Sequence, residues 1–148
     1  KEKRILNFEN KPQNLIPIVI ECAAGIRRNM QIFGDDYNTP DGTCLRDYVH
    51  VTDLAKAHIK ALRRINDNNT IFINLGTGYT HSVYDVIRTV EKITSEKINY
   101  SVTNRREGDP AKLYSSSSFA KKSLDWIAKN SDLENIINTT WNIYKAQI

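Results

Sequence analysis

The chain has 148 residues, of which 40% are hydrophobic and 26% are charged, as expected for one soluble globular domain. This composition excludes a disordered chain, and the apolar run from Leu15 to Ala24 contains Glu21 and is too short to span a bilayer. No charged-then-apolar leader precedes this run, so we expect a cytoplasmic protein that binds no membrane. The formal net charge is +4, but Lys and Arg are scattered, often beside acids and without interleaved aromatic residues, so we expect no binding to nucleic acid.

The first predicted element is a largely buried helix near the N-terminus. Residues 1–13 show no helical or strand periodicity and are expected to be irregular, with Lys11-Pro12 interrupting any regular structure. Asn14 is a candidate helix cap, and the residues from Ile16 to Ala24 are mostly apolar, with Gly25 placed to end the helix.

A short strand is predicted next, over Met30–Phe33. Gly34-Asp35-Asp36 has the composition of a turn that tolerates unusual backbone angles. A polar loop over 37–43 then leads to the central part of the chain.

The central stretch predicts a strand that passes directly into a helix. Val and Tyr nearly alternate with polar residues over Leu45–His50, and apolar residues at helical spacing follow from Leu54 to Ile65. Thr52 or Asp53 is the expected cap of this helix. Arg46 would lie at a sheet end, where ligands of α/β folds commonly bind.

A second strand and helix pair is predicted further along the chain. The strand covers Thr70–Leu75, and Gly76-Thr77-Gly78 is expected to turn the chain rather than to cradle a phosphate, because the third glycine is missing. Ser82 and Asp85 have the spacing of a capping box. The buried face of the helix would consist of Val83, Val86, Ile87, Val90 and Ile93.

The C-terminal part predicts one strand and two closing helices. The strand covers Ile98–Thr103, and Ser115–Ser118 is expected to form a loop and helix cap. The helices are expected over 119–126 and 133–144. The residues expected to face inward are Leu124, Trp126, Leu133, Ile136, Ile137, Trp141 and Tyr144.

Two cysteines and two histidines could suggest a metal site. Cys22, Cys44, His50 and His58 do not have a recognised zinc spacing, so no metal site is expected. The cysteines are more simply small buried thiols, and His50 a hydrogen-bonded packing residue.

Several segments together resemble the extended short-chain dehydrogenases that act on nucleotide sugars, and among them the UDP-hexose 4-epimerases. The segments fall in the order and at roughly the spacing of that family, and the match covers nearly the whole chain after about Asn14. They are 32–37 with 41–43, 45–58, 74–78 with 82–86, and 105–111.

The resemblance implies an α/β fold: the C-terminal substrate-binding portion of a Rossmann-type extended short-chain dehydrogenase, with mixed short strands and about five helices. Residues 1–148 would form a single UDP-sugar-binding domain. The sequence contains no G-x-x-G-x-x-G loop and no Tyr-x-x-x-Lys pair. The N-terminal Rossmann half would therefore be absent, NAD would be bound by that missing half, and this chain would supply no catalytic residue.

The implied activity is the interconversion of UDP-glucose and UDP-galactose through a 4-keto sugar, with NAD as cofactor. The partners implied are a UDP-hexose substrate and, at full length, a second copy in a homodimer. Two alternatives stay open. One is another nucleotide-sugar enzyme of the family, such as a UDP-N-acetylglucosamine or UDP-glucuronate epimerase or a 4,6-dehydratase. The other is a non-catalytic UDP-sugar-binding module or truncated relic.

The resemblance assigns the nucleotide diphosphate to residues from three segments. Asn14 and Leu15 would approach it with side-chain and backbone donors, although Asn14 could equally be only a helix cap. Arg46 and Arg106 would clamp it from two sides, because the planar guanidinium matches phosphate oxygens. The neighbouring Arg105 is interpreted as a surface charge.

The remaining implied contacts concern the base, the ribose and the sugar. The backbone of Gln31 and the ring of Phe33 would lie beside uracil, although without the resemblance Phe33 would be assigned to the core. Asp109 would accept hydrogen bonds from the ribose hydroxyls. Leu113 would border the sugar, where its modest bulk could admit an N-acetylated substrate.

Overall fold

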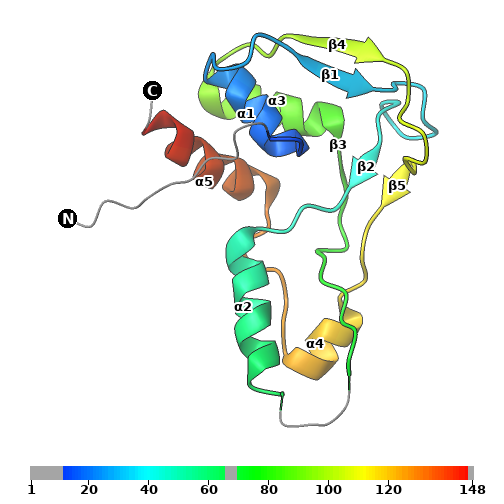
Figure 1. The fold of residues 1–148 in the computed structure, drawn as a ribbon, viewed down its shortest axis with the longest axis vertical. Coiled ribbons are helices and arrows are strands. Elements are labelled where there is room, and N and C mark those ends of the chain that lie inside the picture. Colours follow the sequence, from blue (N-terminus) through cyan, green and yellow to red (C-terminus); the bar gives the residue numbers. More distant parts are fainter. Residues whose placement is uncertain (1–11, 66–69, 147–148) are drawn as a thin grey trace.

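The computed structural model describes residues 12–65 and 70–146. Three helices pack together in the upper part of the molecule (Figure 1). They are α1 (Leu15–Ala23), α3 (Val83–Thr94) and α5 (Leu133–Lys145). Their buried faces form the larger hydrophobic cluster of the described residues, which is completed by Met30, Ile32 and Ile98.

The strands are short and form two small sheets. β1 (Met30–Phe33) pairs in parallel with β4 (Tyr100–Thr103), and Phe33 lies opposite Thr103. In the second sheet β2 (Leu45–Arg46) is central. It pairs antiparallel with β3 (His81–Ser82) and in parallel with β5 (Lys112–Leu113).

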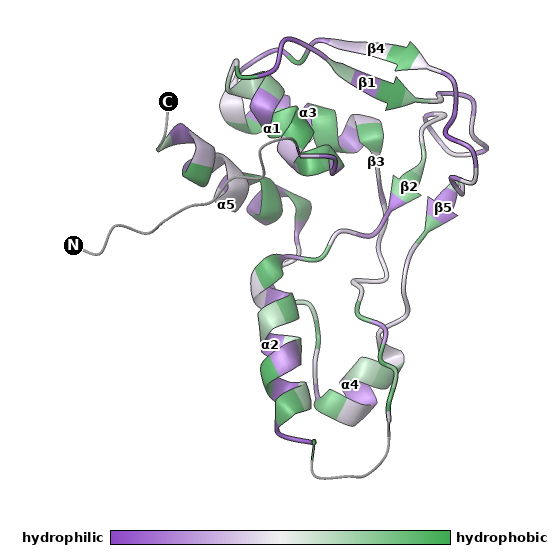
Figure 2. Cartoon of the chain, viewed as in Figure 1, coloured by the Kyte–Doolittle hydropathy of each residue, from purple (hydrophilic) through white to green (hydrophobic). Residues whose placement is uncertain are grey.

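The lower part contains α2 (Val51–Leu62) and α4 (Ser118–Leu124) around a smaller hydrophobic cluster (Figure 1). Figure 2 shows hydrophobic residues in the helices of both parts. Trp126 is 1% exposed, and its indole N–H donates to the backbone oxygen of Asp53 over 2.8 Å. Among the described residues, no helix has the length and apolar character needed to cross a membrane.

The fully buried Asp53 holds the start of α2 against the chain that follows α4. Its carboxylate accepts hydrogen bonds from the Asn130 amide at 2.7 Å and from the Ser131 hydroxyl at 2.8 Å. Burial raises the pKa of Asp53, but these hydrogen bonds outweigh that effect and leave its pKa below the usual value.

Several predicted elements are confirmed. β1 has the predicted bounds, and the capping box of Ser82 and Asp85 is complete at the start of α3. The α5 helix runs from Leu133 and ends one residue beyond the predicted end. His50 is a buried, hydrogen-bonded residue, as expected, with Thr52 and Thr139 hydroxyls on its two ring nitrogens.

Other predictions were wrong in extent. The strand expected over Leu45–His50 consists only of Leu45 and Arg46, and Thr70–Leu75 forms no strand with any part of the chain that the structure describes. The cap of α2 is His50 rather than Thr52 or Asp53. The Thr52 hydroxyl contacts the His50 ring, and the Asp53 carboxylate accepts hydrogen bonds from Asn130 and Ser131.

The boundaries of the C-terminal elements also differ. β4 begins at Tyr100 rather than Ile98, and α4 ends at Leu124, where Asp125 adopts a left-handed backbone conformation. The irregular segment predicted over 1–13 lies almost wholly outside the described residues.

Candidate functional site

A cavity of about 1080 Å³ lies beside α1, β1, β2 and the loop that follows β4. It brings together seven of the eight residues that the sequence predicts for the nucleotide site. These are Asn14, Leu15, Gln31, Phe33, Arg46, Arg106 and Asp109. Residues separated by more than ninety positions therefore share one concave surface.

Arg46 is held in place by the loop after β4. One terminal nitrogen of its guanidinium donates to the backbone oxygens of Leu45 and Pro110, each over 2.9 Å. The other terminal nitrogen pairs with the Asp109 carboxylate at 3.1 Å. The Arg46 side chain is 21% exposed, so its charge is only partly screened by water and remains open to the cavity.

Arg106 lies over an aromatic ring of β1. Its guanidinium carbon is 3.8 Å from the centre of the Phe33 ring, a cation–π contact. Phe33 is half-buried and lines the cavity, so it is not a core residue. One face of the ring that was expected beside uracil already carries a cation.

The start of α1 also borders the cavity. Asn14 occupies the capping position, but within the described residues its side chain makes no capping hydrogen bond. Leu15 is the first helical residue, so the positive end of the α1 dipole lies at the cavity. Gln31 is an exposed residue of β1 on the same surface.

Leu113 does not belong to the cavity as the described residues define it. It lies in β5 opposite Arg46, and 57% of it is exposed. Its predicted position beside the sugar therefore stays a prediction.

The sequence analysis did not identify Cys44, Asp47 and Tyr48, which also line the cavity. These residues are close to Arg46 in the sequence, and this proximity could have indicated that they line the same cavity. Burial raises the pKa of the Cys44 thiol and of the Tyr48 hydroxyl, so both groups are neutral at pH 7. They add a neutral wall beside the arginines.

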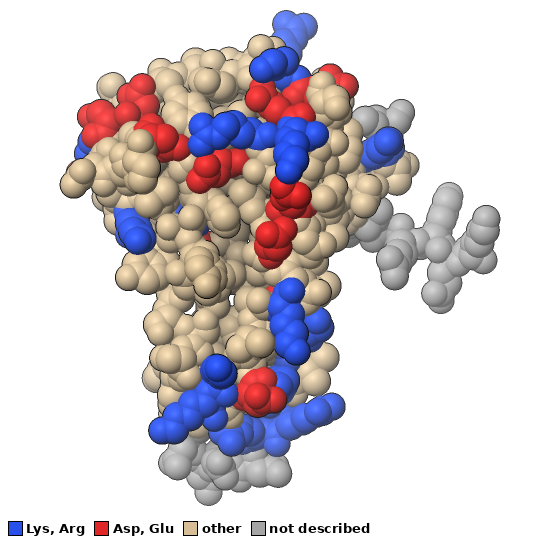
Figure 3. Space-filling view, turned by 180° about the vertical axis from the view of Figure 1, so that it is seen from behind, with Lys and Arg blue, Asp and Glu red and all other residues tan. Residues whose placement is uncertain are grey.

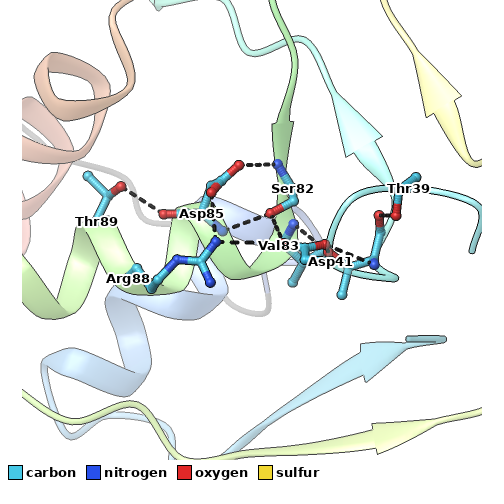
Figure 4. A network of polar contacts seen from close by, with 8 residues as sticks. Thr39, Asp41, Ser82, Val83, Asp85, Arg88 and Thr89 are labelled. Carbon is cyan, nitrogen blue, oxygen red and sulfur yellow. Dashed lines mark hydrogen bonds and ion pairs between the residues drawn. The ribbon is translucent and has the colours of Figure 1, made fainter. Parts of the chain in front are cut away.

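A polar network fixes the start of β2 (Figure 4). The Asp41 carboxylate accepts hydrogen bonds from the backbone N–H and the hydroxyl of Thr43, at 3.0 and 2.8 Å, and from the Ser82 hydroxyl. The buried Thr43 hydroxyl in turn accepts from the Val83 amide at 3.1 Å. This network attaches the loop before β2, the strand that carries Arg46, to the start of α3.

Basic side chains also gather away from the cavity. Figure 3 shows a largely basic lower part, whereas acidic and basic groups alternate in the upper part. Lys60, Arg63, Arg64 and Lys122 line a hollow there together with Asp125. The scatter of charges along the sequence did not reveal this cluster, because α2 and α4 meet only in the fold.

The fold and the cavity together indicate the class of protein. It is an α/β protein with parallel strand pairs and a cavity whose two arginines suit a phosphorylated ligand. Residues 3–76 match the model of the NAD dependent epimerase/dehydratase family. The chain belongs to that family.

Similar proteins agree with this assignment. The chain is 44% identical over 135 residues to a UDP-glucose 4-epimerase of Haemophilus influenzae, covering 90% of the chain and 40% of the relative. Identity to the human UDP-glucose 4-epimerase is 48%, over 79% of the chain and 34% of the relative.

A solved relative supports the fold. A Stenotrophomonas maltophila UDP-glucose-4-epimerase, with bound NAD and formylated UDP-arabinopyranose, matches with a TM-score of 0.88 and 39% identity. That match covers 95% of the chain and 42% of the solved protein. The chain thus spans between about a third and two fifths of the length of these relatives.

The family depends on NAD, but the segment Gly76–Gly78 does not fit the phosphates of NAD. The glycine pair around Thr77 would be the candidate cradle, yet the amides of Thr77 and Gly78 donate to the Asp47 carboxylate at 3.0 and 3.1 Å. A Cβ on Gly76 would come within 2.6 Å of the same carboxylate. As the sequence predicts, this segment is a turn, and its donors are already used.

Proposed function

We propose that residues 1–148 form the C-terminal UDP-sugar-binding domain of a nucleotide-sugar 4-epimerase that interconverts UDP-glucose and UDP-galactose. One observation carries this proposal: Arg46, Arg106, Asp109 and Phe33 line a single cavity. The names of the relatives, at 44% and 48% identity, support the same activity.

The proposed contacts follow from the chemistry of the cavity. A guanidinium presents two parallel N–H donors, which match the oxygens of a diphosphate. Arg46 and Arg106 would approach the diphosphate from β2 and from the loop after β4, with the positive end of α1 nearby. The Asp109 carboxylate, which pairs with Arg46 in the free protein, would then accept hydrogen bonds from the ribose hydroxyls as well.

This chain would hold the unreactive end of the substrate. NAD, when bound by the rest of a full-length protein, supplies the hydride acceptor for carbon 4 of the sugar. The residues described here would instead fix the UDP group while the sugar turns, so that binding energy far from the reacting carbon provides orientation. We expect the 148-residue chain to show no epimerase activity by itself.

Calorimetry with UDP tests the proposal. The wild-type chain should bind UDP with saturation, and it should bind cytidine diphosphate more weakly if the base is read. Arg106→Ala should weaken UDP binding, whereas Lys92→Ala, which removes an exposed ion pair between α3 and α5, should leave it unchanged. Addition of NAD should not alter the result. Absence of saturable binding at millimolar UDP would refute the proposed site.

A further inference from the structure

We propose that Arg105 is a positioning residue for the nucleotide site: it fastens the loop 104–111 to the turn after β1 and thereby aims Arg106 and Asp109 into the cavity. This inference rests on the proposed function. Arg105 is exposed, as its interpretation as a surface charge implies, and the proposal gives this charge a role.

Although its side chain is 45% exposed, Arg105 contacts two residues of the turn after β1. Its Nε lies 2.6 Å from a carboxylate oxygen of Asp36, and a terminal nitrogen donates to the Asp36 backbone oxygen. Its guanidinium carbon is 4.2 Å from the centre of the Tyr37 ring. The hydrogen bond from Arg105 lowers the pKa of Asp36, so the pair stays charged at neutral pH.

The turn that receives Arg105 is built around a buried tyrosine. Tyr37 is 5% exposed, and its amide donates to the Gly42 backbone oxygen over 2.8 Å. Gly34 has φ +82, and a Cβ there would meet the Arg105 side chain at 2.6 Å and the Tyr37 ring at 2.8 Å. The turn therefore leaves room for these two side chains only because residue 34 is glycine.

Adjacent arginines thus lie on two rings that flank one turn. Arg105 covers Tyr37, and Arg106 covers Phe33. Three positions further on, Asp109 pairs with Arg46. If the contact of Arg105 with the turn were lost, the backbone bond from Leu45 to Ala111 would still hold the end of the loop. The side-chain contacts of Arg106 with Phe33 and of Asp109 with Arg46, however, involve groups that the nucleotide itself must engage. The Arg105 contact can persist while the ligand binds, because Arg105 is not among the residues that line the cavity in the described part of the chain.

The experiment compares the 148-residue wild type with Arg105→Ala, Arg105→Lys and Asp36→Asn. The matched control is Lys92→Ala, since Lys92 and Glu134 form an ion pair of the same 2.6 Å length that is also exposed. Three quantities are measured: UDP affinity by calorimetry, thermal unfolding, and hydrogen exchange of the Asp109 amide, which donates to the Arg106 backbone oxygen at 3.3 Å.

We expect Arg105→Ala to weaken UDP binding by roughly three- to tenfold and to speed exchange at Asp109, with a melting temperature within about 3 °C of wild type. Arg105→Lys should restore part of the affinity, and Asp36→Asn should resemble Arg105→Ala. Lys92→Ala should change neither the affinity nor the exchange.

The two hypotheses fail in different ways. If the wild type does not bind UDP, the proposed function is wrong, while exchange at Asp109 still tests whether Arg105 fastens the loop. If Arg105→Ala leaves both the exchange and the affinity at wild-type values, Arg105 is only a surface charge and the inference is overturned.

Discussion

Substitution of Arg46 gives the sharpest test of the cavity, because lysine and alanine separate its charge from its shape. Arg46→Lys keeps a positive charge but loses the planar fork that reaches Pro110 and Asp109 together. Arg46→Ala removes the charge as well. Differences between the two variants therefore measure how much of the binding depends on paired donors.

The structure sets the expected magnitudes. A hydrogen bond to a charged group contributes about 1.5–3 kcal/mol, so loss of the Arg46 contact to a diphosphate should weaken UDP binding by about 10- to 150-fold in Arg46→Ala. Arg46→Lys should lie between this variant and the wild type. In the free protein the ion pair with Asp109 is partly exposed, 21% and 34%, so its loss should reduce the free energy of unfolding by only about 1 kcal/mol.

Calorimetry with UDP and urea denaturation followed by circular dichroism provide the two measurements. Arg88→Lys is the matched control, because Arg88 is also paired with aspartates, Asp41 and Asp85, but is 62% exposed and lies outside the cavity lining of the described chain. Wild-type affinity in Arg46→Ala would refute the assignment of Arg46 to the diphosphate. A large loss of stability in Arg46→Lys would show that the residue is mainly structural.

Two further substitutions test the frame around the site. Asp53→Asn should lower the free energy of unfolding by about 3–5 kcal/mol at pH 7, because a buried carboxylate with hydrogen bonds is replaced; the exposed Asp125→Asn should change it little. Because the pKa of Asp53 is lower in the folded than in the unfolded protein, its carboxylate contributes fully to the free energy of unfolding above the unfolded pKa of about 3.9, and this contribution is lost as the pH falls through the folded pKa. The free energies of unfolding of wild type and Asp53→Asn should therefore converge only in acid. A constant difference down to pH 2 would contradict this reasoning. Ser82→Ala should cost about 1 kcal/mol in urea denaturation, and Ser118→Ala, outside a capping bond, should cost less; equal effects would exclude a role for the capping box.

The elements that could be predicted from the sequence are those whose cause is local. The Ser82 and Asp85 capping box acts over three residues, and the apolar spacing of α3 and α5 gives their buried faces directly. The Met30–Phe33 strand is short and ends at Gly34, whose φ of +82 stops the extended conformation.

The elements that were missed depend on distant partners. Thr70–Leu75 has the composition of a strand, but a strand also requires a paired neighbour, and none is present among the described residues. Leu45–His50 is a strand only where Ser82 and Lys112 supply partners, at Leu45 and Arg46. At the start of α2, the Asp53 carboxylate and the ring of the capping residue His50 likewise have distant partners, Asn130 and Ser131 for the first and Thr139 for the second.

For the site, the family resemblance indicated which residues gather, but the contacts among them in the ligand-free chain required the fold. Nothing in the sequence pairs Arg46 with Asp109 or lays Arg106 on Phe33, because both contacts join segments more than sixty positions apart. Arg105 is exposed, as expected of a surface charge, but its ion pair with Asp36 could not be predicted, since Asp36 is a distant partner.

The pairing of two strands fixes both ends of the loop 104–111. Because Phe33 pairs with Thr103, the loop must begin beside the end of β1. Because the Leu45 amide donates to the Ala111 backbone oxygen over 2.8 Å, it must end beside Arg46. The loop fixed at these two ends brings Arg106 and Asp109 into the lining of the cavity. Any change that shifts either register would therefore displace Arg106 and Asp109 together, even with every side chain of the cavity intact.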